Sequence, residues 1–297
     1  MTPIVNAHAH SAMIAFRGKG RGLPLDRWLN EVIWPLEAKE VNPDFVYRET
    51  INAIKEMQEC GTSAFMDMYF FEDSVAKAAQ EMNMPVVIGE GLIDIKGDDI
   101  FRKDLDKTLE LIEKYKGNSL VKVSVAPHSP YTVKDNNLLK AKKIAKENNC
   151  IYQIHTSETK KEFDDSIKKY GLTPVEYLNS LGVLDSKTVL IHCVHLTDKD
   201  ISIIKENDCK VVHCPESNIM LKSGVAPVYR MLKEGITVAL GTDGGASCDR
   251  LDIVRAGKLA QELHKSKYND GTEITDEDVE KMMNVNGLKT LGMENCL

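Results

Sequence analysis

Apolar and polar positions along the chain follow two periods in turn, one typical of buried strands and the other of helices. The stretches 43–61, 74–83, 103–117 and 136–149 carry apolar residues at helical spacing. The first of them has a proline near its start and a glycine at its end, as helices often do. Short apolar runs, typical of strands, lie before, between and after these stretches: 3–10, 62–68, 84–92, 120–128, 150–156, 187–193, 210–215 and 236–243. The chain is therefore predicted to contain eight strands separated by helices.

Eight strands that alternate with helices favour parallel βαβ units closed into an α/β barrel of the (β/α)8 type. An open doubly wound sheet is the alternative, but no G-x-G-x-x-G motif follows the first strand. Since no linker-like or low-complexity stretch interrupts the pattern, we expect one barrel domain over residues 1–297. The charged run 160–169 is interpreted as a solvated helix face.

Composition narrows the class of protein further. The 297 residues are 42% hydrophobic and 28% charged, which suits a globular protein, and the net charge of -7 argues against nucleic acid as a partner. No apolar run approaches the ~20 residues of a membrane span, and the start of the chain lacks the features of a signal peptide. The 7 scattered cysteines contain no C-x-x-C motif, so we expect reduced thiols and a cytoplasmic location.

Polar residues recur where the predicted strands end. In a barrel the carboxyl ends of the strands meet at one face, which carries the active site. His8 and His10 end the first strand, and because they are two positions apart their side chains leave it on the same side. The other strand-end residues are His128, His155, His192, His213 and Asp243. Imidazoles with one carboxylate suit a divalent metal ion such as zinc, so His8, His10, His155 and Asp243 are the predicted ligand set.

The remaining candidates divide into a catalytic residue and structural histidines. Glu158 follows His155 by three positions, where a carboxylate can carry a proton between water and substrate. The alternative for Glu158 is a helix-start glutamate that interacts with the helix dipole. His213 stays open between a buried core residue and a functional one, and His195 and His264 are interpreted as structural.

Eight segments carry a resemblance to a known family. They are "NAHAHSAM" (6–13), "LPLDRWLNEVIWPLEAK" (23–39), "APHSPYT" (126–132), "IHTSE" (154–158), "HCVHL" (192–196), "HCPESN" (213–218), "SGVAPV" (223–228) and "LGTDGGAS" (240–247). With these segments in this order, the chain resembles the amidohydrolase superfamily and, within it, the methylthioadenosine/S-adenosylhomocysteine deaminases.

The resemblance implies a metal-dependent hydrolase that deaminates adenine nucleosides. One metal ion, zinc or in some members iron, would be held by the predicted ligand set. Glu158 would donate a proton to the ring nitrogen beside C6, Asp243 would accept the proton of the attacking water, and His192 would stabilise the developing charge. Glu37 and His128 would contact the ribose. Ammonia would leave, and a hypoxanthine nucleoside would remain.

The sequence departs from the family pattern in two places. The family usually carries a small β-sandwich before and after the barrel, whereas His8 lies near the start here and the chain ends at "LGMENCL". We therefore expect the barrel portion alone, with bared apolar surface that favours a homo-oligomer. Glu90 stands where members that accept S-adenosylhomocysteine carry an arginine, and Arg102 matches their second tail-binding arginine. A short neutral 5′ substituent is therefore the expected preference.

Two other functions remain open at this point. One is another aminohydrolase or chlorohydrolase of the same branch, acting on guanine, a pterin or a triazine. The other is a barrel that binds a nucleoside or a partner without catalysis. The metal and proton-transfer residues count against the second of these alternatives.

Overall fold

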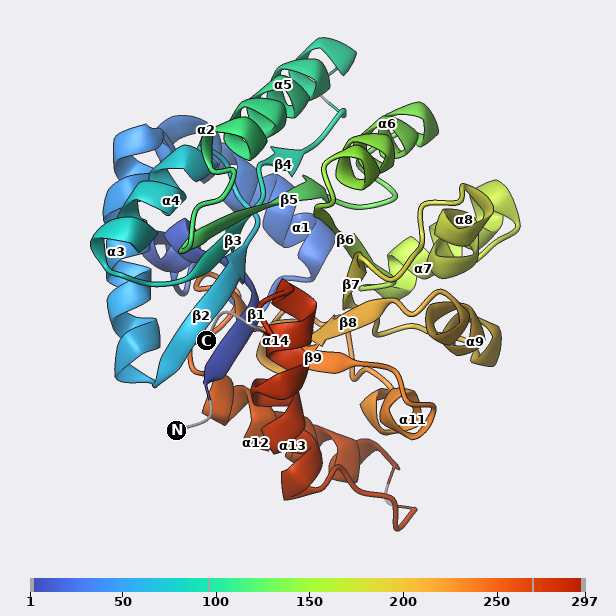
Figure 1. Cartoon of the computed structure of the whole chain (residues 1–297). Helices are drawn as coiled ribbons and strands as arrows, with labels where there is room; N and C mark the ends of the chain where they lie inside the picture. Colours follow the sequence, from blue (N-terminus) through green and yellow to red (C-terminus); the bar gives the residue numbers. More distant parts are fainter. Residues whose placement is uncertain (1–2, 96, 269, 295–297) are drawn as a thin grey trace.

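The fold is a closed parallel barrel surrounded by helices (Figure 1). The computed structural model describes residues 3–95, 97–268 and 270–294. The strands lie in the order β10-β1-β2-β3-β5-β6-β7-β8-β9, with β4 paired to β5. Their bounds are β1 Ile4–His10, β2 Thr62–Asp67, β3 Val86–Ile88, β4 Gly91–Leu92, β5 Val121–Pro127, β6 Ile151–Thr156, β7 Thr188–His192, β8 Lys210–His213, β9 Val238–Leu240 and β10 Asp243–Gly244. The predicted barrel architecture is confirmed.

One segment closes the barrel. Strand β9 pairs with β8, and β10, three residues further along, pairs with β1 at Ala9 and Asp243. The last predicted strand therefore forms two short strands, β9 and β10, which pair with β8 and β1 and close the barrel. The third predicted strand is also split, into β3 and β4 around Gly89. A Cβ at Gly89 would stand 2.6 Å from Ser124 Oγ and 2.7 Å from Gln153 Nε2, so this position has no room for a side chain.

The helices follow the predicted stretches, with ends shifted by a few residues. Helix α3 begins at Pro43, where the side chain of Asn42 accepts a hydrogen bond from the amide of Phe45 at 3.0 Å. The helices surrounding the barrel are α3 Pro43–Glu59, α4 Glu72–Glu81, α5 Asp98–Lys114, α6 Asp135–Glu147, α7 Lys160–Tyr170, α8 Pro174–Ser180, α9 Asp198–Glu206, α10 Pro215–Met220, α11 Val228–Lys233, α12 Ile253–Tyr268 and α13 Asp276–Met283. The charged run 160–169 forms α7, a largely exposed helix from which Glu162 turns inward and is buried.

Helix α14 (Val285–Leu291) covers the end of the barrel where the strands begin. Its Leu288 and Leu291 belong to the same buried cluster as Val5 of β1. Gly287 lies so close to β1 that a Cβ there would stand 2.6 Å from the Cβ of Val5. The contact between α14 and β1 is therefore apolar.

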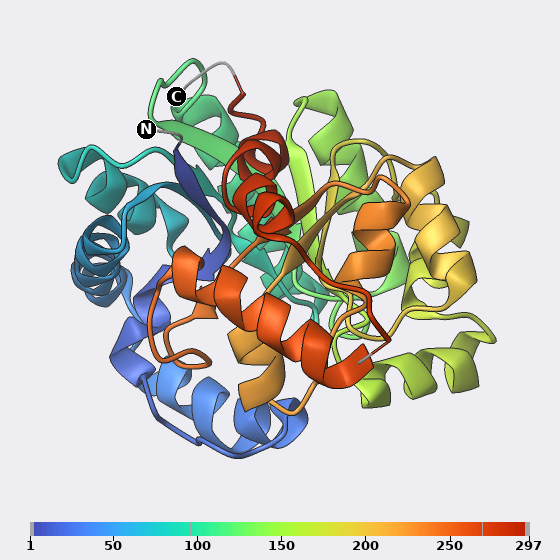
Figure 2. The same ribbon diagram turned by 90° about the horizontal axis from the view of Figure 1, so that it is seen from below.

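The segment between β1 and α3 lies at the opposite end of the barrel, as Figure 2 shows with α14 in red and this segment in blue. It folds into η1 (Ser11–Phe16), α1 (Leu25–Trp28), η2 (Leu29–Ile33) and α2 (Trp34–Glu40). Trp28 is buried, and its indole Nε1 donates to the carbonyl of Lys19 at 3.0 Å. This segment forms one wall of a cavity over the carboxyl ends of the strands.

Candidate active site

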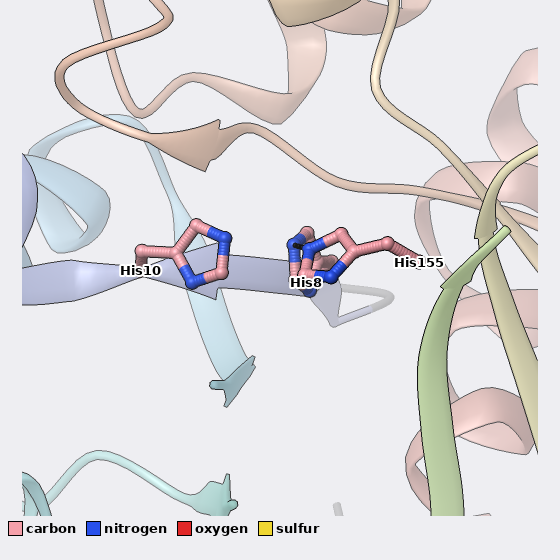
Figure 3. A group of neighbouring side chains, drawn as sticks. All are labelled: His8, His10 and His155. Carbon is pink, nitrogen blue, oxygen red and sulfur yellow. Dashed lines mark hydrogen bonds between the residues drawn. The ribbon is translucent and has the colours of Figure 1, made fainter. Parts of the chain in front are cut away.

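The structure brings the four predicted metal ligands together at the carboxyl end of the barrel. The Nε2 atoms of His8 and His155 lie 3.2 Å apart. Asp243 Oδ1 lies 3.1 Å from His10 Nε2 and 3.6 Å from His8 Nε2. Figure 3 shows the three imidazoles converging from β1 and β6, as the strand-end pattern predicts. One ligand atom from each histidine lies within 4.8 Å of the others, and such a group could hold a metal ion.

Hydrogen bonds at Nδ1 orient two of these rings. His155 Nδ1 lies 2.7 Å from the carbonyl oxygen of His128, and His10 Nδ1 contacts the carbonyl oxygen of Met68. A carbonyl only accepts, so each Nδ1 carries a proton, and in the neutral form of each ring Nε2 keeps its lone pair for the cluster centre. Metal-ligating histidines commonly show this arrangement.

The charges in the cluster are set by burial and by Asp243. Burial lowers the pKa of His8 to about 4 and that of His155 well below its usual value, so both rings are neutral near pH 7. Burial also opposes charge on His10, but the hydrogen bond and charge of Asp243 outweigh it and raise the pKa of His10 to about 9. A metal ion at this place must therefore compete with a proton on His10, which makes metal affinity depend on pH.

The spacing of these atoms fits a small divalent cation. Ligand atoms bound to tetrahedral zinc at ~2.0–2.1 Å are roughly 3.3 Å from one another. Three separations in the cluster, 3.1, 3.2 and 3.6 Å, lie on both sides of that value, and the ligand atoms of the three histidines lie within 4.8 Å of one another. Neutral imidazoles and one carboxylate are also ligands that zinc and iron accept.

Glu158 and His192 lie beside the cluster and are almost completely buried. Glu158 Oε2 is 3.7 Å from His192 Nε2, and Glu158 Oε1 accepts a hydrogen bond from Ser223 Oγ at 3.3 Å. His192 Nδ1 faces the Oδ1 atom of Asn218 at 2.8 Å, so Nε2 points toward Glu158. Burial, reinforced by the charge of Asp243, raises the pKa of Glu158 to about 8. A carboxyl group with such a pKa can hold and donate a proton near neutrality.

The backbone around these side chains adopts conformations that residues other than glycine rarely take. Positive φ angles occur at Ser157 (52°), His192 (75°), Cys193 (48°) and Asp243 (64°). Such conformations cost of order 1–3 kcal/mol each and cluster at functional sites. Here they turn the chain at the ends of β6 and β7 and at the start of β10.

Two serines hold Asp243, and the sequence assigned no role to either. Its Oδ1 faces the histidines, while its Oδ2 accepts hydrogen bonds from Ser217 Oγ at 2.5 Å and from Ser247 Oγ at 3.0 Å. Both serines lie in segments that carry the family resemblance, and both come a few residues after a strand end. Their position shortly after a strand end was the sequence feature that could have identified them.

The cavity over the cluster is lined by both predicted ribose contacts, Glu37 and His128. Tyr69, which follows β2, donates its phenol hydrogen to Glu37 Oε1 at 2.8 Å. His128 Nδ1 lies 3.0 Å from Thr132 Oγ1. Tyr69 was not among the residues predicted from the sequence, although its position just after a strand end could have indicated it.

Two predicted substrate contacts, Glu90 and Arg102, lie outside the lining of this cavity. The Glu90 carboxylate is buried at the start of α4, where it accepts hydrogen bonds from the amides of Phe71 at 3.3 Å and Glu72 at 3.0 Å. Arg102 lies on the exposed side of α5 and pairs with Asp99 at 2.9 Å. Neither residue lines the cavity, because the Glu90 carboxylate is held by amides at the start of α4 and Arg102 lies on the exposed side of α5.

The other histidines lie outside the cavity as well. His213 is 1% exposed, and burial lowers its pKa to about 3, as in a neutral core residue. His195 Nε2 lies 2.8 Å from the carbonyl oxygen of Ser223, and His264 Nε2 lies 3.0 Å from Thr272 Oγ1. These contacts are of the structural kind expected for His195 and His264.

A parallel barrel with a buried histidine–carboxylate cluster at the carboxyl ends of its strands suits a hydrolase that uses a metal ion. The model of the amidohydrolase family matches residues 3–296, and the chain belongs to this family. The prediction of the family from the eight segments is confirmed. None of the helices in the described part of the chain has the length and apolar character that a membrane crossing needs.

Two relatives that are named as deaminases match nearly the whole of this chain. A 5-methylthioadenosine/S-adenosylhomocysteine deaminase of Thermodesulfovibrio yellowstonii is 41% identical over 299 residues, which is 99% of this chain and 67% of that protein. A 5′-deoxyadenosine deaminase of Methanothermobacter thermautotrophicus is 41% identical over 293 residues, which is 98% of this chain and 68% of that protein.

Solved structures show the same fold. An adenosine deaminase from Xanthomonas campestris with bound zinc superposes with a TM-score of 0.94 at 34% identity, over 99% of this chain and 67% of that one. A guanine deaminase from C. acetobutylicum with bound guanine superposes with a TM-score of 0.90 at 25% identity, over 98% of this chain and 73% of that one.

Proposed function

We propose that the protein is a metal-dependent hydrolytic deaminase of adenine nucleosides. 5′-Deoxyadenosine and 5′-methylthioadenosine are the leading substrates, and adenosine and S-adenosylhomocysteine are further candidates. The observation that carries the proposal is the buried proton-transfer pair Glu158–His192 next to a cluster suited to a metal ion. Relatives named as deaminases of these nucleosides, at about two fifths identity over nearly the whole chain, support the choice of substrate.

The metal ion is proposed to be zinc, with iron as the alternative, held by His8, His10, His155 and Asp243. When bound, such an ion supplies Lewis acidity and makes a water molecule reactive near neutral pH. The bound zinc of the Xanthomonas adenosine deaminase supports this choice of metal.

The residues of the chain would carry out the proton transfers. Water adds to C6 of the adenine ring, and Asp243 accepts one of its protons. Glu158 donates a proton to the ring nitrogen beside C6, while His192, held by Asn218, stabilises the oxygen at the attacked carbon. Asp243 then passes the water proton to the amino nitrogen, the bond between C6 and that nitrogen breaks, and ammonia leaves. The hydroxyl proton at C6 returns to Glu158, and the hypoxanthine nucleoside is left.

Glu37 and His128 are proposed to bind the ribose. A carboxylate accepts hydrogen bonds from the two hydroxyls of a ribose, and Glu37 lies in the wall of the cavity with Tyr69 fixing one of its oxygens. The glutamate therefore places the sugar at the mouth of the cavity, with the base nearer to the cluster.

Ammonia release from a panel of compounds tests the proposal. The panel contains 5′-deoxyadenosine, 5′-methylthioadenosine, adenosine, S-adenosylhomocysteine, guanine, a pterin and a triazine, each with zinc-loaded and iron-loaded protein. The Glu158→Gln variant serves as the control for contaminating deaminases. Turnover of adenine nucleosides alone would support the proposal. Turnover of guanine, the pterin or the triazine in their place would overturn it, as would no turnover by protein that holds its metal.

A further inference from the structure

Four helices of the protein begin with the same pattern, a threonine followed three positions later by a carboxylate. The pairs are Thr159–Glu162 in α7, Thr173–Glu176 in α8, Thr197–Asp200 in α9 and Thr275–Asp278 in α13. In each pair the threonine side chain accepts a hydrogen bond from the amide of the acidic residue, as a helix cap does. Such a pattern commonly forms a capping box, in which the carboxylate in turn accepts the amide hydrogen of the threonine.

Helix α7 departs from this arrangement. In the other three helices the carboxylate accepts the amide hydrogen of its own threonine. Glu162 of α7 reaches further back along the chain instead. Its Oε1 accepts the amide hydrogen of Ser157 at 2.9 Å, and its Oε2 accepts that of Glu158 at 2.7 Å. Both oxygens therefore bind the turn that carries the proposed proton donor.

The turn between β6 and α7 is strained and is held from two sides. Ser157 has a φ of 52°, a conformation that residues other than glycine rarely adopt. The carbonyl oxygen of Ser157 accepts the amide hydrogens of Val194 and His195, each at 3.0 Å, from the segment that follows β7. These bonds fix one edge of the peptide group that joins Ser157 to Glu158. Glu162 fixes the opposite edge of the same peptide group.

The surroundings of Glu162 leave its carboxylate to the two amides. Glu162 is 7% exposed, and among the described residues no lysine or arginine forms an ion pair with it. Lys160 and Lys161, its neighbours along the chain, pair with carboxylates further along α7. Burial raises the pKa of Glu162 to about 7, and the hydrogen bonds from the two amides oppose this rise. Because a buried carboxylate is unfavourable without compensating hydrogen bonds, these two bonds determine where the side chain lies.

We propose that Glu162 is a positioning residue for proton transfer, which holds the backbone of Glu158 so that the Glu158 carboxyl group stays beside His192. This inference rests on the proposed function. Glu162 does not line the cavity, so it acts through Glu158 and not on the substrate. Misplacement of a reacting group by about 1 Å can lower a rate about 10²-fold.

The variant Glu162→Gln tests the inference, because an amide side chain has one acceptor oxygen where a carboxylate has two. Its NH2 group would face one of the two backbone amides, and that hydrogen bond would be lost. We expect kcat for 5′-deoxyadenosine to fall about 10- to 100-fold and KM to change less than about threefold. The metal content should stay unchanged. All rates are compared at one pH, above the pKa of Glu162.

The variant Glu176→Gln in α8 is the matched control. Glu176 accepts the amide hydrogen of Thr173 at 3.0 Å in an ordinary capping box, and it does not line the cavity. The control therefore removes an equivalent helix-start contact away from the site. It should lower the melting temperature while leaving kcat unchanged.

A second comparison asks whether Glu162 acts through Glu158. In protein that already carries Glu158→Gln, the change Glu162→Gln should lower kcat by no more than about threefold, because the group that it positions is already gone. A purely structural role would lower kcat by the same factor in both backgrounds.

The outcomes separate this inference from the proposed function. If the unmodified protein deaminates adenine nucleosides, three results would overturn the inference alone: kcat of Glu162→Gln within about threefold of the unmodified protein, the same loss of kcat in both backgrounds, or a loss of metal that accounts for the loss of kcat. If Glu162→Gln does not fold, Glu162→Asp is judged by the same criteria, since its shorter carboxylate cannot reach both amides. No turnover by unmodified protein that holds its metal would overturn the proposed function and this inference together.

Discussion

Replacing Glu158 by glutamine removes a proton-transfer group while preserving the shape of the side chain. An amide can still accept the hydrogen bond that Ser223 Oγ donates to Glu158 Oε1. It cannot give up a proton as the carboxyl group does. Because burial and the charge of Asp243 raise the pKa of Glu158 to about 8, the carboxyl group is largely protonated at neutral pH and the variant loses that proton.

The size of the effect follows from the surroundings of the side chain. General acid–base catalysis contributes typically ~10²–10⁴-fold. Glu158 is 3% exposed, so bulk water cannot replace it easily. The neighbouring Glu162 cannot substitute either, because its two oxygens accept the amide hydrogens of Ser157 at 2.9 Å and Glu158 at 2.7 Å. We therefore expect kcat to fall about 10³-fold, or about 4 kcal/mol in transition-state stabilisation.

The assay measures kcat and KM for ammonia release together with the metal content of the purified variant. The metal should be retained, and KM should change little. Ser223→Ala is the matched control: it keeps the carboxyl group, removes one neutral hydrogen bond and should cost no more than about tenfold. In the unmodified protein kcat should fall as the pH rises through the pKa of Glu158, whereas the glutamine variant should lack this decline.

Two results would refute this reasoning. Activity of Glu158→Gln within about tenfold of the unmodified protein would show that another group transfers the proton. Loss of metal in parallel with activity would show that Glu158 supports the metal site instead. Either result would also remove the main observation behind the proposed function.

Further predictions concern the metal, the ribose and stability. His8→Ala should lose most of the bound metal in elemental analysis, and full retention would contradict the ligand assignment. Glu37→Gln should raise KM for nucleosides at least about tenfold with a smaller change in kcat, because a charge-assisted contact to the ribose is weakened. Gly287→Ala should lower the free energy of unfolding by about 1–3 kcal/mol in denaturant titration, because its Cβ would meet β1 at 2.6 Å; unchanged stability would show that α14 shifts freely. Burial opposes charge on Asp73, but hydrogen bonds from Lys114 and Lys77 outweigh it and lower its pKa to about 2; the stability it contributes is present above its usual pKa of 3.8 and is lost as the pH falls toward 2. The melting temperature of Asp73→Asn should therefore fall less than that of the unmodified protein over that pH interval.

The grouping of the histidines could be predicted from the sequence because these residues lie on strands. A strand has a side-chain period of two, and parallel strands in a barrel present their carboxyl ends at one face. His8, His10 and His155 are therefore brought together by strand position alone, whatever the loops do. The eight segments of the resemblance added the family, and the structure confirmed the barrel.

The sequence could not predict where a side chain points when its direction depends on a helix or a loop. Glu90 comes directly before strand β4, but its carboxylate caps the start of α4, since two backbone amides 18 or more residues away point at it. Arg102 lies on the exposed face of α5, where it pairs with Asp99. A spacing along the chain does not specify which of several nearby hydrogen-bond donors a buried carboxylate meets.

The tertiary structure alone decided which polar residues support the site. Tyr69 and Glu37 are 32 residues apart, and Ser217 and Asp243 are 26 apart, yet each pair is hydrogen bonded. Glu162 looked like part of a solvated charged run, but packing of α7 against the barrel buries it below Glu158. Period and strand order determine where a backbone goes, whereas side-chain partners follow from packing between distant elements, because a buried polar atom must find a partner within hydrogen-bond distance.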